Sequence, residues 1–151
     1  MRKNTLIVLA GLPGAGKSTF AKMLEETGWT VACPDRVRKM LYGDEKIQGD
    51  GNKVFSLAYE IATLAGQQKK DVVFDATSTT RKARKQLLNA TKELFDFVLC
   101  YYFEPDLDVC LARNETRERQ VPTAVICRME TQWETPTADE GFDYVTRVET
   151  P

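Results

Sequence analysis

The sequence contains no histidine, so the most common general base of enzymes is absent and proton abstraction near neutral pH falls to an aspartate or a glutamate. Its four cysteines, Cys33, Cys100, Cys110 and Cys127, form no C-x-x-C pair, and no histidine is available to complete a zinc site with them. We therefore expect them to be reduced, mostly core residues of a cytoplasmic protein.

Long apolar runs are also absent. Leu6–Ala10 is a short run, whereas a membrane helix needs ~18 apolar residues, so we expect no membrane partner. The same stretch is shorter than the ~7 to 15 residues of a secretory signal, and we expect none here. The 21 Lys and Arg residues nearly cancel the 22 Asp and Glu residues, which excludes a broad electropositive surface. Any contact with nucleic acid is therefore local.

The chain has 151 residues, of which 42% are hydrophobic and 28% are charged, as in an ordinary globular protein. This length suits one core, so we expect residues 1–151 to form a single domain. Buried strands are predicted by runs rich in β-branched and aromatic residues at Thr5–Ala10, Thr30–Cys33, Asp71–Phe74, Phe97–Phe103 and Tyr144–Val148.

Helical patterns separate these runs. Apolar residues recur at three- and four-residue steps over Asn52–Gln68, Asp106 is placed to cap a helix, and Pro122 is placed to open another. Strands that alternate with helices predict an α/β fold of three layers, α/β/α, with a five-stranded parallel sheet and a helical lid. We expect the first strand to be central.

A phosphate-binding motif follows the first strand. The pattern G-x-x-x-x-G-K-[ST] is matched by Gly11, Leu12, Pro13, Gly14, Ala15, Gly16, Lys17, Ser18 and Thr19. In such a P-loop the backbone N–H groups surround the β-phosphate, Lys17 reaches the β/γ oxygens and Ser18 binds Mg²⁺. ATP and Mg²⁺ are thus the expected cofactors. The chain is short and lacks N-K-x-D, so a kinase is favoured over a switch GTPase.

A carboxylate and a guanidinium follow the second strand at a spacing of three residues. Asp35 is placed to accept the proton of an attacking hydroxyl, and Arg38 to hold an anionic group of the acceptor. The residues alone allow a second interpretation equally well. In it, Asp35 caps the helix that runs through Met40 and Arg38 is a solvated charge.

Asp75 follows the third strand, where Walker-B carboxylates lie close to the P-loop metal. It is placed to support Mg²⁺ through water or to orient Arg38 and the acceptor; alternatively it is a turn carboxylate. A basic cluster follows at Arg81, Lys82, Arg84 and Lys85. We expect this cluster to be a solvated helix face, with contact to a phosphodiester backbone as the weaker alternative.

Arginines concentrate between two expected helices at Arg113, Arg117 and Arg119. An arginine that closes over the γ-phosphate stabilises charge during transfer, so this segment is predicted to be the lid. The alternative is a surface helix end whose arginines match the helix dipole.

These motifs together resemble the polynucleotide 5′-kinase family, which includes the kinase domains of phage-type and animal polynucleotide kinase-phosphatases. The resemblance rests on GLPGAGKST, on D-x-x-R after the second strand, on D-x-T after the third, on R-N-x-x-R followed by V-P, and on the closing E-T-P-T-A-D-E-G-F-D-Y-V. It extends from Leu6 to Val148. The P-loop is generic, whereas the D-x-x-R and P-T-x-x-E-G-F segments discriminate between families.

The resemblance implies a role for each matching residue. Lys17 and Ser18 would bind ATP and Mg²⁺, and Asp35 would be the base that activates a 5′-hydroxyl. Arg38 would clamp the acceptor's 3′-phosphate, with Asp75 and Thr77 beside it in the acceptor site. For the lid, it implies that Arg117 acts on the transferred phosphoryl group, or Arg119 because the segment is one residue shorter than in the phage form. Arg113 would contact the adenine ring.

The leading hypothesis is ATP-dependent phosphorylation of a 5′-hydroxyl end of DNA, RNA or a nucleotide. Its nearest rival is a small-molecule or antibiotic kinase that uses the same Asp35 on another alcohol. A third hypothesis is a nucleotide-dependent regulatory binding module with little turnover.

Overall fold

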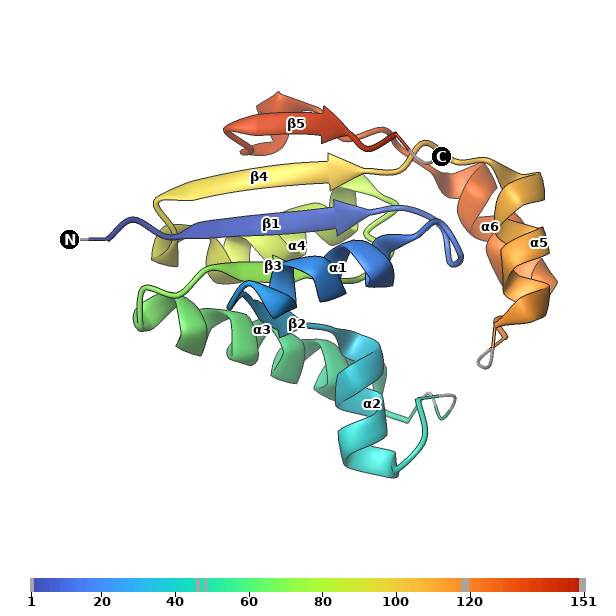
Figure 1. Cartoon of the computed structure of the whole chain (residues 1–151), viewed down its shortest axis with the longest axis horizontal. Helices are drawn as coiled ribbons and strands as arrows, with labels where there is room; N and C mark the ends of the chain where they lie inside the picture. Colours follow the sequence, from blue (N-terminus) through green and yellow to red (C-terminus); the bar gives the residue numbers. More distant parts are fainter. Residues whose placement is uncertain (1, 46, 48, 118–119, 150–151) are drawn as a thin grey trace.

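Five parallel strands form the middle layer of the protein, in the order β2-β3-β1-β4-β5 (Figure 1). Their bounds are β1 Thr5–Ala10, β2 Thr30–Ala32, β3 Val72–Phe74, β4 Phe97–Tyr102 and β5 Tyr144–Arg147. The computed structural model describes residues 2–45, 47, 49–117 and 120–149. The predicted parallel sheet with the first strand at its centre is confirmed.

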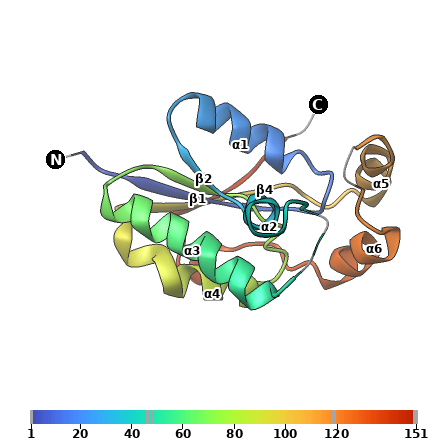
Figure 2. The same cartoon turned by 90° about the horizontal axis from the view of Figure 1, so that it is seen from below.

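Helices cover both faces of the sheet. The helices are α1 Lys17–Glu26, α2 Pro34–Tyr42, α3 Gly51–Gln67, α4 Arg81–Thr91, α5 Leu107–Thr116 and α6 Thr123–Gln132, with short 3₁₀ turns η1 Lys92–Leu94 and η2 Ala138–Glu140. Figure 2 shows α1 on one face and α3 and α4 on the other. The α5 and α6 helices lie together beyond the carboxyl ends of the strands (Figures 1 and 2).

The continuous apolar run of β1 is explained by burial on both faces. Leu6 and Val8 point into the core beneath α3 and α4, whereas Ile7 and Leu9 point into the core beneath α1. Leu6, Val8 and Leu9 are completely buried. A strand that is covered on both sides needs apolar residues at every position rather than at alternate ones.

The starts of α3, α5 and α6 agree with the sequence to within one residue. Asp106 caps α5 as predicted, because its side chain accepts a hydrogen bond from the backbone N–H of Val109 at 3.2 Å. Pro122, however, is the residue before α6 rather than its first residue. Its ψ of 134° is extended, and the helical turn begins at Thr123.

The cysteines are free, as expected, and three of the four are buried. Burial raises the pKa of the Cys33 thiol to about 11 and that of Cys100 to about 12. Both therefore stay protonated near neutral pH. Across the described part of the chain, no helix combines the length and apolar character that a membrane crossing requires.

Candidate active site

A cleft of about 1540 Å³ lies at the carboxyl-terminal edge of the sheet. Its lining follows the order of the strands, with Asp35 after β2, Asp75 after β3, the P-loop after β1, Phe103 after β4 and Val148 after β5. The predicted site residues that line it are Pro13, Gly14, Gly16, Lys17, Ser18, Thr19, Asp35, Arg38, Asp75, Thr77, Arg113 and Arg117. One cleft thus brings the predicted nucleotide and acceptor residues together.

The P-loop forms a tight turn into the first helix. Gly14 and Gly16 have φ of 86° and 108°, in the left-handed region that favours glycine. A Cβ on Gly14 would lie 2.9 Å from the backbone oxygen of Cys110, so α5 itself excludes a side chain there. Leu12 is completely buried and holds the loop to the core. The loop leads directly into the N-terminus of α1, whose backbone N–H groups suit an anion.

Lys17 and Asp75 form the least exposed charged part of the cleft, at 7% and 8% exposure. Burial lowers the pKa of Lys17, an effect that the Asp75 carboxylate opposes. The pKa of Asp75 is raised, first by burial, and the Lys17 ammonium opposes that rise. The Lys17 Nζ donates to the backbone oxygen of Leu12 at 2.9 Å. A phosphate oxygen is able to replace that carbonyl as the acceptor.

Ser18 and Asp75 provide the oxygens that suit a magnesium ion. The Ser18 hydroxyl donates to an Asp75 carboxylate oxygen at 3.4 Å beside the P-loop. Within residues 2–45, 47, 49–117 and 120–149, no three histidine, cysteine or acidic side chains gather into a metal cage. The Ser18 hydroxyl and an Asp75 carboxylate oxygen could hold Mg²⁺, which usually binds one or two protein oxygens together with the phosphates of a nucleotide.

Asp75 also makes the stability of the protein depend on pH. Because its carboxyl keeps its proton to higher pH in the folded protein, wild type loses stability as the pH rises from about 4 through the raised pKa. Asp75→Asn does not titrate. We expect the free energy of unfolding of this variant to rise relative to that of wild type as the pH increases from about 4 through the raised pKa of Asp75. Urea denaturation across that range measures this, and a constant difference would contradict it.

Asp35 and Arg38 form an ion pair at the start of α2. The helix begins at Pro34 and its N-cap is Cys33, so the alternative that Asp35 is the cap is wrong. An Arg38 Nη1 donates to Asp35 Oδ1 at 2.6 Å, and the Arg38 side chain is only 12% exposed. Arg38 is therefore not a solvated charge. Its Nε is buried and has no hydrogen-bond partner among the described residues.

The predicted lid arginines lie on or after α5. Arg113 donates to the P-loop carbonyl oxygens of Gly14 and Ala15 at 3.3 and 3.2 Å. Arg117 is the residue after α5, and its positive charge contributes to the lowered pKa of Lys17. Arg119 lies outside the described residues. Contact of Arg113 with adenine and action of Arg117 on the γ-phosphate stay predictions.

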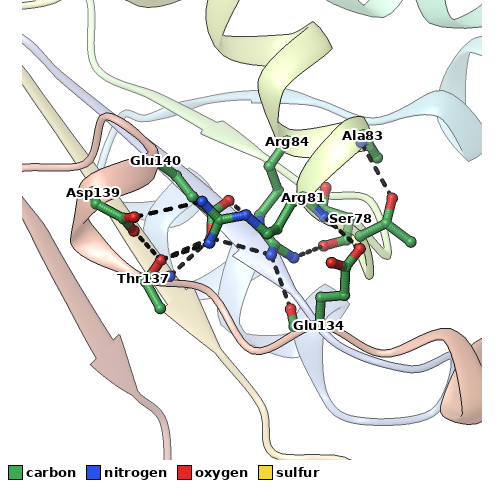
Figure 3. A network of polar contacts seen from close by, with 9 residues as sticks. Ser78, Arg81, Ala83, Arg84, Glu134, Thr137, Asp139 and Glu140 are labelled. Carbon is green, nitrogen blue, oxygen red and sulfur yellow. Dashed lines mark hydrogen bonds and ion pairs between the residues drawn. The ribbon is translucent and has the colours of Figure 1, made fainter.

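Arg84 overturns the expectation that the basic cluster is a solvated face. Its side chain is completely buried, and its guanidinium donates to three acceptors (Figure 3). These are the backbone oxygens of Ser78 at 2.8 Å and of Glu134 at 2.9 Å, and the Glu140 carboxylate at 2.7 Å. Arg81, Lys82 and Lys85 are exposed, as expected.

The Arg84 network holds the loop that carries Asp75 and Thr77 into the cleft, which we call the acceptor loop (residues 75–80). Ser78 in this loop has a φ of 43°, which a non-glycine residue rarely adopts. The backbone oxygen of Thr77 also accepts from the Gly11 N–H at 2.9 Å. The acceptor loop is thus bonded to the P-loop on one side and to Arg84 on the other.

Two aromatic residues that line the cleft were not predicted from the sequence. Phe55 and Tyr59 lie one turn apart on α3, and both line the cleft while half-buried. The apolar face predicted for this helix packs against the core except at Leu64, which is exposed, and the two rings lie beside this face. Their spacing of four residues just off the apolar face is the signal that identifies them.

Comparisons with known proteins agree with the fold. A profile of the family described as an AAA domain matches residues 6–136. The L-seryl-tRNA(Sec) kinase of Methanococcus maripaludis is 27% identical over 147 residues, which cover 91% of this chain and 56% of that kinase.

Two solved structures also superpose well on the chain. A chain of the Pnkp1/Rnl/Hen1 RNA repair complex has a TM-score of 0.77 and 20% identity, over 87% of this chain and 44% of that one. A gluconokinase from Sinorhizobium meliloti 1021 has a TM-score of 0.60 and 18% identity, over 100% of this chain and 86% of that one. Both show the P-loop kinase fold. The chain spans about half the length of the seryl-tRNA kinase and of the repair-complex chain.

Proposed function

The chain belongs to the AAA domain family and has the P-loop kinase fold, and on this premise we propose that it transfers the γ-phosphoryl group of ATP to a 5′-hydroxyl of a nucleic acid or nucleotide. One observation carries the proposal. Asp35 and Arg38, bonded at 2.6 Å, line the same cleft as Lys17 and Ser18. β2 and β1 are two strands apart, roughly 10 Å, which leaves room for an acceptor between Asp35 and the P-loop.

Each residue then has a defined task in the reaction. Asp35 accepts the proton of the attacking hydroxyl, whose oxygen forms the new bond to the γ-phosphorus as the bond to the bridging oxygen of ADP breaks. Lys17 and Arg117 bind the phosphate oxygens whose charge grows during transfer. Ser18, with support from Asp75, would hold Mg²⁺, which would supply charge neutralisation for the phosphates of the nucleotide when bound.

Arg38 is proposed to bind an acceptor phosphate. Its side chain lines the cleft, and its guanidinium offers charged N–H donors that suit a phosphate. A 5′-hydroxyl nucleotide with a 3′-phosphate should therefore be a better acceptor than the nucleoside by 10-fold or more, on the order expected for a charged hydrogen bond.

The test compares kcat/KM for a 3′-nucleotide and its nucleoside in wild type, Arg38→Ala and Arg38→Lys. In Arg38→Ala the preference should nearly vanish while the KM for ATP stays constant. Arg38→Lys should recover part of it, because an ammonium lacks the planar fork. Equal discrimination by wild type and Arg38→Ala would contradict the assignment and favour a small-alcohol acceptor.

The 27% identity to a seryl-tRNA kinase favours a second candidate, in which the acceptor is another primary hydroxyl, attached to RNA or to a small molecule. Transfer of labelled phosphate from ATP is measured with a 5′-hydroxyl oligonucleotide, a 3′-nucleotide, seryl-tRNA and gluconate. Selective labelling of the first two supports our proposal. Selective labelling of seryl-tRNA or gluconate replaces it, and ATP binding with no transfer to any of them favours a regulatory binding module.

A further inference from the structure

We propose that Phe55 and Tyr59 form a stacking platform for the base of the acceptor, so that the acceptor carries a planar ring close to the phosphorylated hydroxyl. This inference rests on the proposed function, because it names the part of the nucleotide that the acceptor end of the cleft binds.

The position of the two rings assigns them to the acceptor rather than to ATP. They lie on α3, which packs against α2 and against strands β2 and β3. These strands lead to Asp35 and to the acceptor loop. On the side of β4 and β5, the cleft is lined by Arg113 and Val148. Arg38 lies on α2, and α3 packs against α2. An acceptor held by Arg38 would therefore have the rings of Phe55 and Tyr59 beside it.

The packing of Phe55 leaves it available to a ligand. Its ring meets Tyr59 edge-on, with centroids 6.2 Å apart, and Phe55 lies outside the hydrophobic core clusters of the described residues. Tyr59 in turn packs against the buried Phe74 at 5.7 Å, which fixes the platform to β3. A half-buried aromatic residue inside a cleft, backed by a rigid partner, is typical of a surface on which bases stack.

The chemistry distinguishes a nucleotide from a sugar acid. A base gains by stacking on an aromatic ring whatever its sequence identity, whereas a ring-free acceptor such as gluconate leaves Phe55 exposed to water. Stacking of one base typically contributes about 5- to 150-fold in affinity. We therefore expect kcat/KM for adenosine 3′-phosphate to be about 5- to 150-fold higher than kcat/KM for the same ribose phosphate without a base.

The experiment measures kcat/KM for adenosine 3′-phosphate and for abasic ribose 3-phosphate at saturating ATP. Phe55→Ala should reduce the preference for the base to about twofold or less, and Phe55→Trp should retain it because the platform is preserved. Tyr59→Phe should also retain it, since the ring and its contact with Phe74 remain. Leu64→Ala, an exposed residue on the same helix and outside the cleft, is the matched control and should behave as wild type.

Circular dichroism and the KM for ATP verify that Phe55→Ala is folded and binds nucleotide normally. If wild type prefers adenosine 3′-phosphate and Phe55→Ala keeps that preference, the platform is wrong. If wild type uses both acceptors equally, the platform is again wrong while the proposed function stands. If wild type phosphorylates neither of them but does phosphorylate gluconate or seryl-tRNA, the proposed function itself has failed.

Discussion

Asp35→Ala is expected to lower the rate of phosphoryl transfer by about 10²- to 10⁴-fold, the usual contribution of a general base, while ATP binds as in wild type. Lys17→Ala should also abolish transfer, but through weakened ATP binding, because Lys17 is the buried cation of the P-loop. Nucleotide titration by calorimetry, together with single-turnover transfer, separates the two losses. Asp35→Asn should resemble Asp35→Ala, since the amide keeps the size of the side chain but not its basicity.

Glu25→Ala is the matched control for the Asp35 variants. Glu25 pairs with Arg36 at the same 2.6 Å as Asp35 with Arg38, but this pair is exposed and Glu25 does not line the cleft. The control should transfer phosphate at the wild-type rate. If Asp35→Ala weakened ATP binding as severely as Lys17→Ala while acceptor phosphorylation survived, Asp35 would not be the base.

Arg84→Met is expected to destabilise the protein by about 3–5 kcal/mol, because it leaves the Glu140 carboxylate buried without its partner. For a domain of this size, that lowers the melting temperature by roughly 6–20 °C. Arg81→Ala is the matched control. Arg81 joins the same network from an exposed position and its ion pairs are 3.6 Å long, so its loss should cost about 1 kcal/mol or less. Thermal and urea denaturation measure all three proteins.

The double variant Arg84→Met/Glu140→Leu separates stability from positioning. Replacing a buried ion pair by apolar side chains of similar size is often neutral or stabilising, so the double variant should regain most of the lost stability. The backbone oxygens of Ser78 and Glu134 nevertheless lose their donor, which loosens the acceptor loop. We expect the KM for the acceptor to exceed the wild-type value in both Arg84 variants, and the KM for ATP in the double variant to equal the wild-type value. If the double variant had wild-type KM values for both the acceptor and ATP, Arg84 would contribute to stability alone.

The sheet was predictable because its signal is local. A strand covered on both faces must be apolar along its whole length, and β1 and β4 are read from single uninterrupted runs. The ends were harder to predict. Cys33 and Phe103 continue their apolar runs, but each residue leaves its strand to begin the turn toward the cleft. Apolar character fixes what is buried and not where the strand stops.

The carboxylates of the site were predictable because they follow strands. Asp35 and Asp75 were located from parallel strands whose carboxyl ends share one edge. The burial of Arg84 was not predictable, because its partners Glu134 and Glu140 lie 50 and 56 residues away in the chain. A run of basic residues on a helix has the same pattern whether or not a distant segment folds over one of them. The P-T-x-x-E-G-F segment has a structural role in that contact, since Glu140 both pairs with Arg84 and caps η2.

The order of the strands also divides the cleft into two parts that are formed by different elements. The P-loop, α5 and the end of β5 form one half, whereas β2, β3, α2 and α3 form the other. Under the proposed function, substitutions in α2 and α3 would change the acceptor half without altering the P-loop residues assigned to the triphosphate. Grafting α2 and α3 between members of the fold is therefore the natural route to engineer acceptor choice.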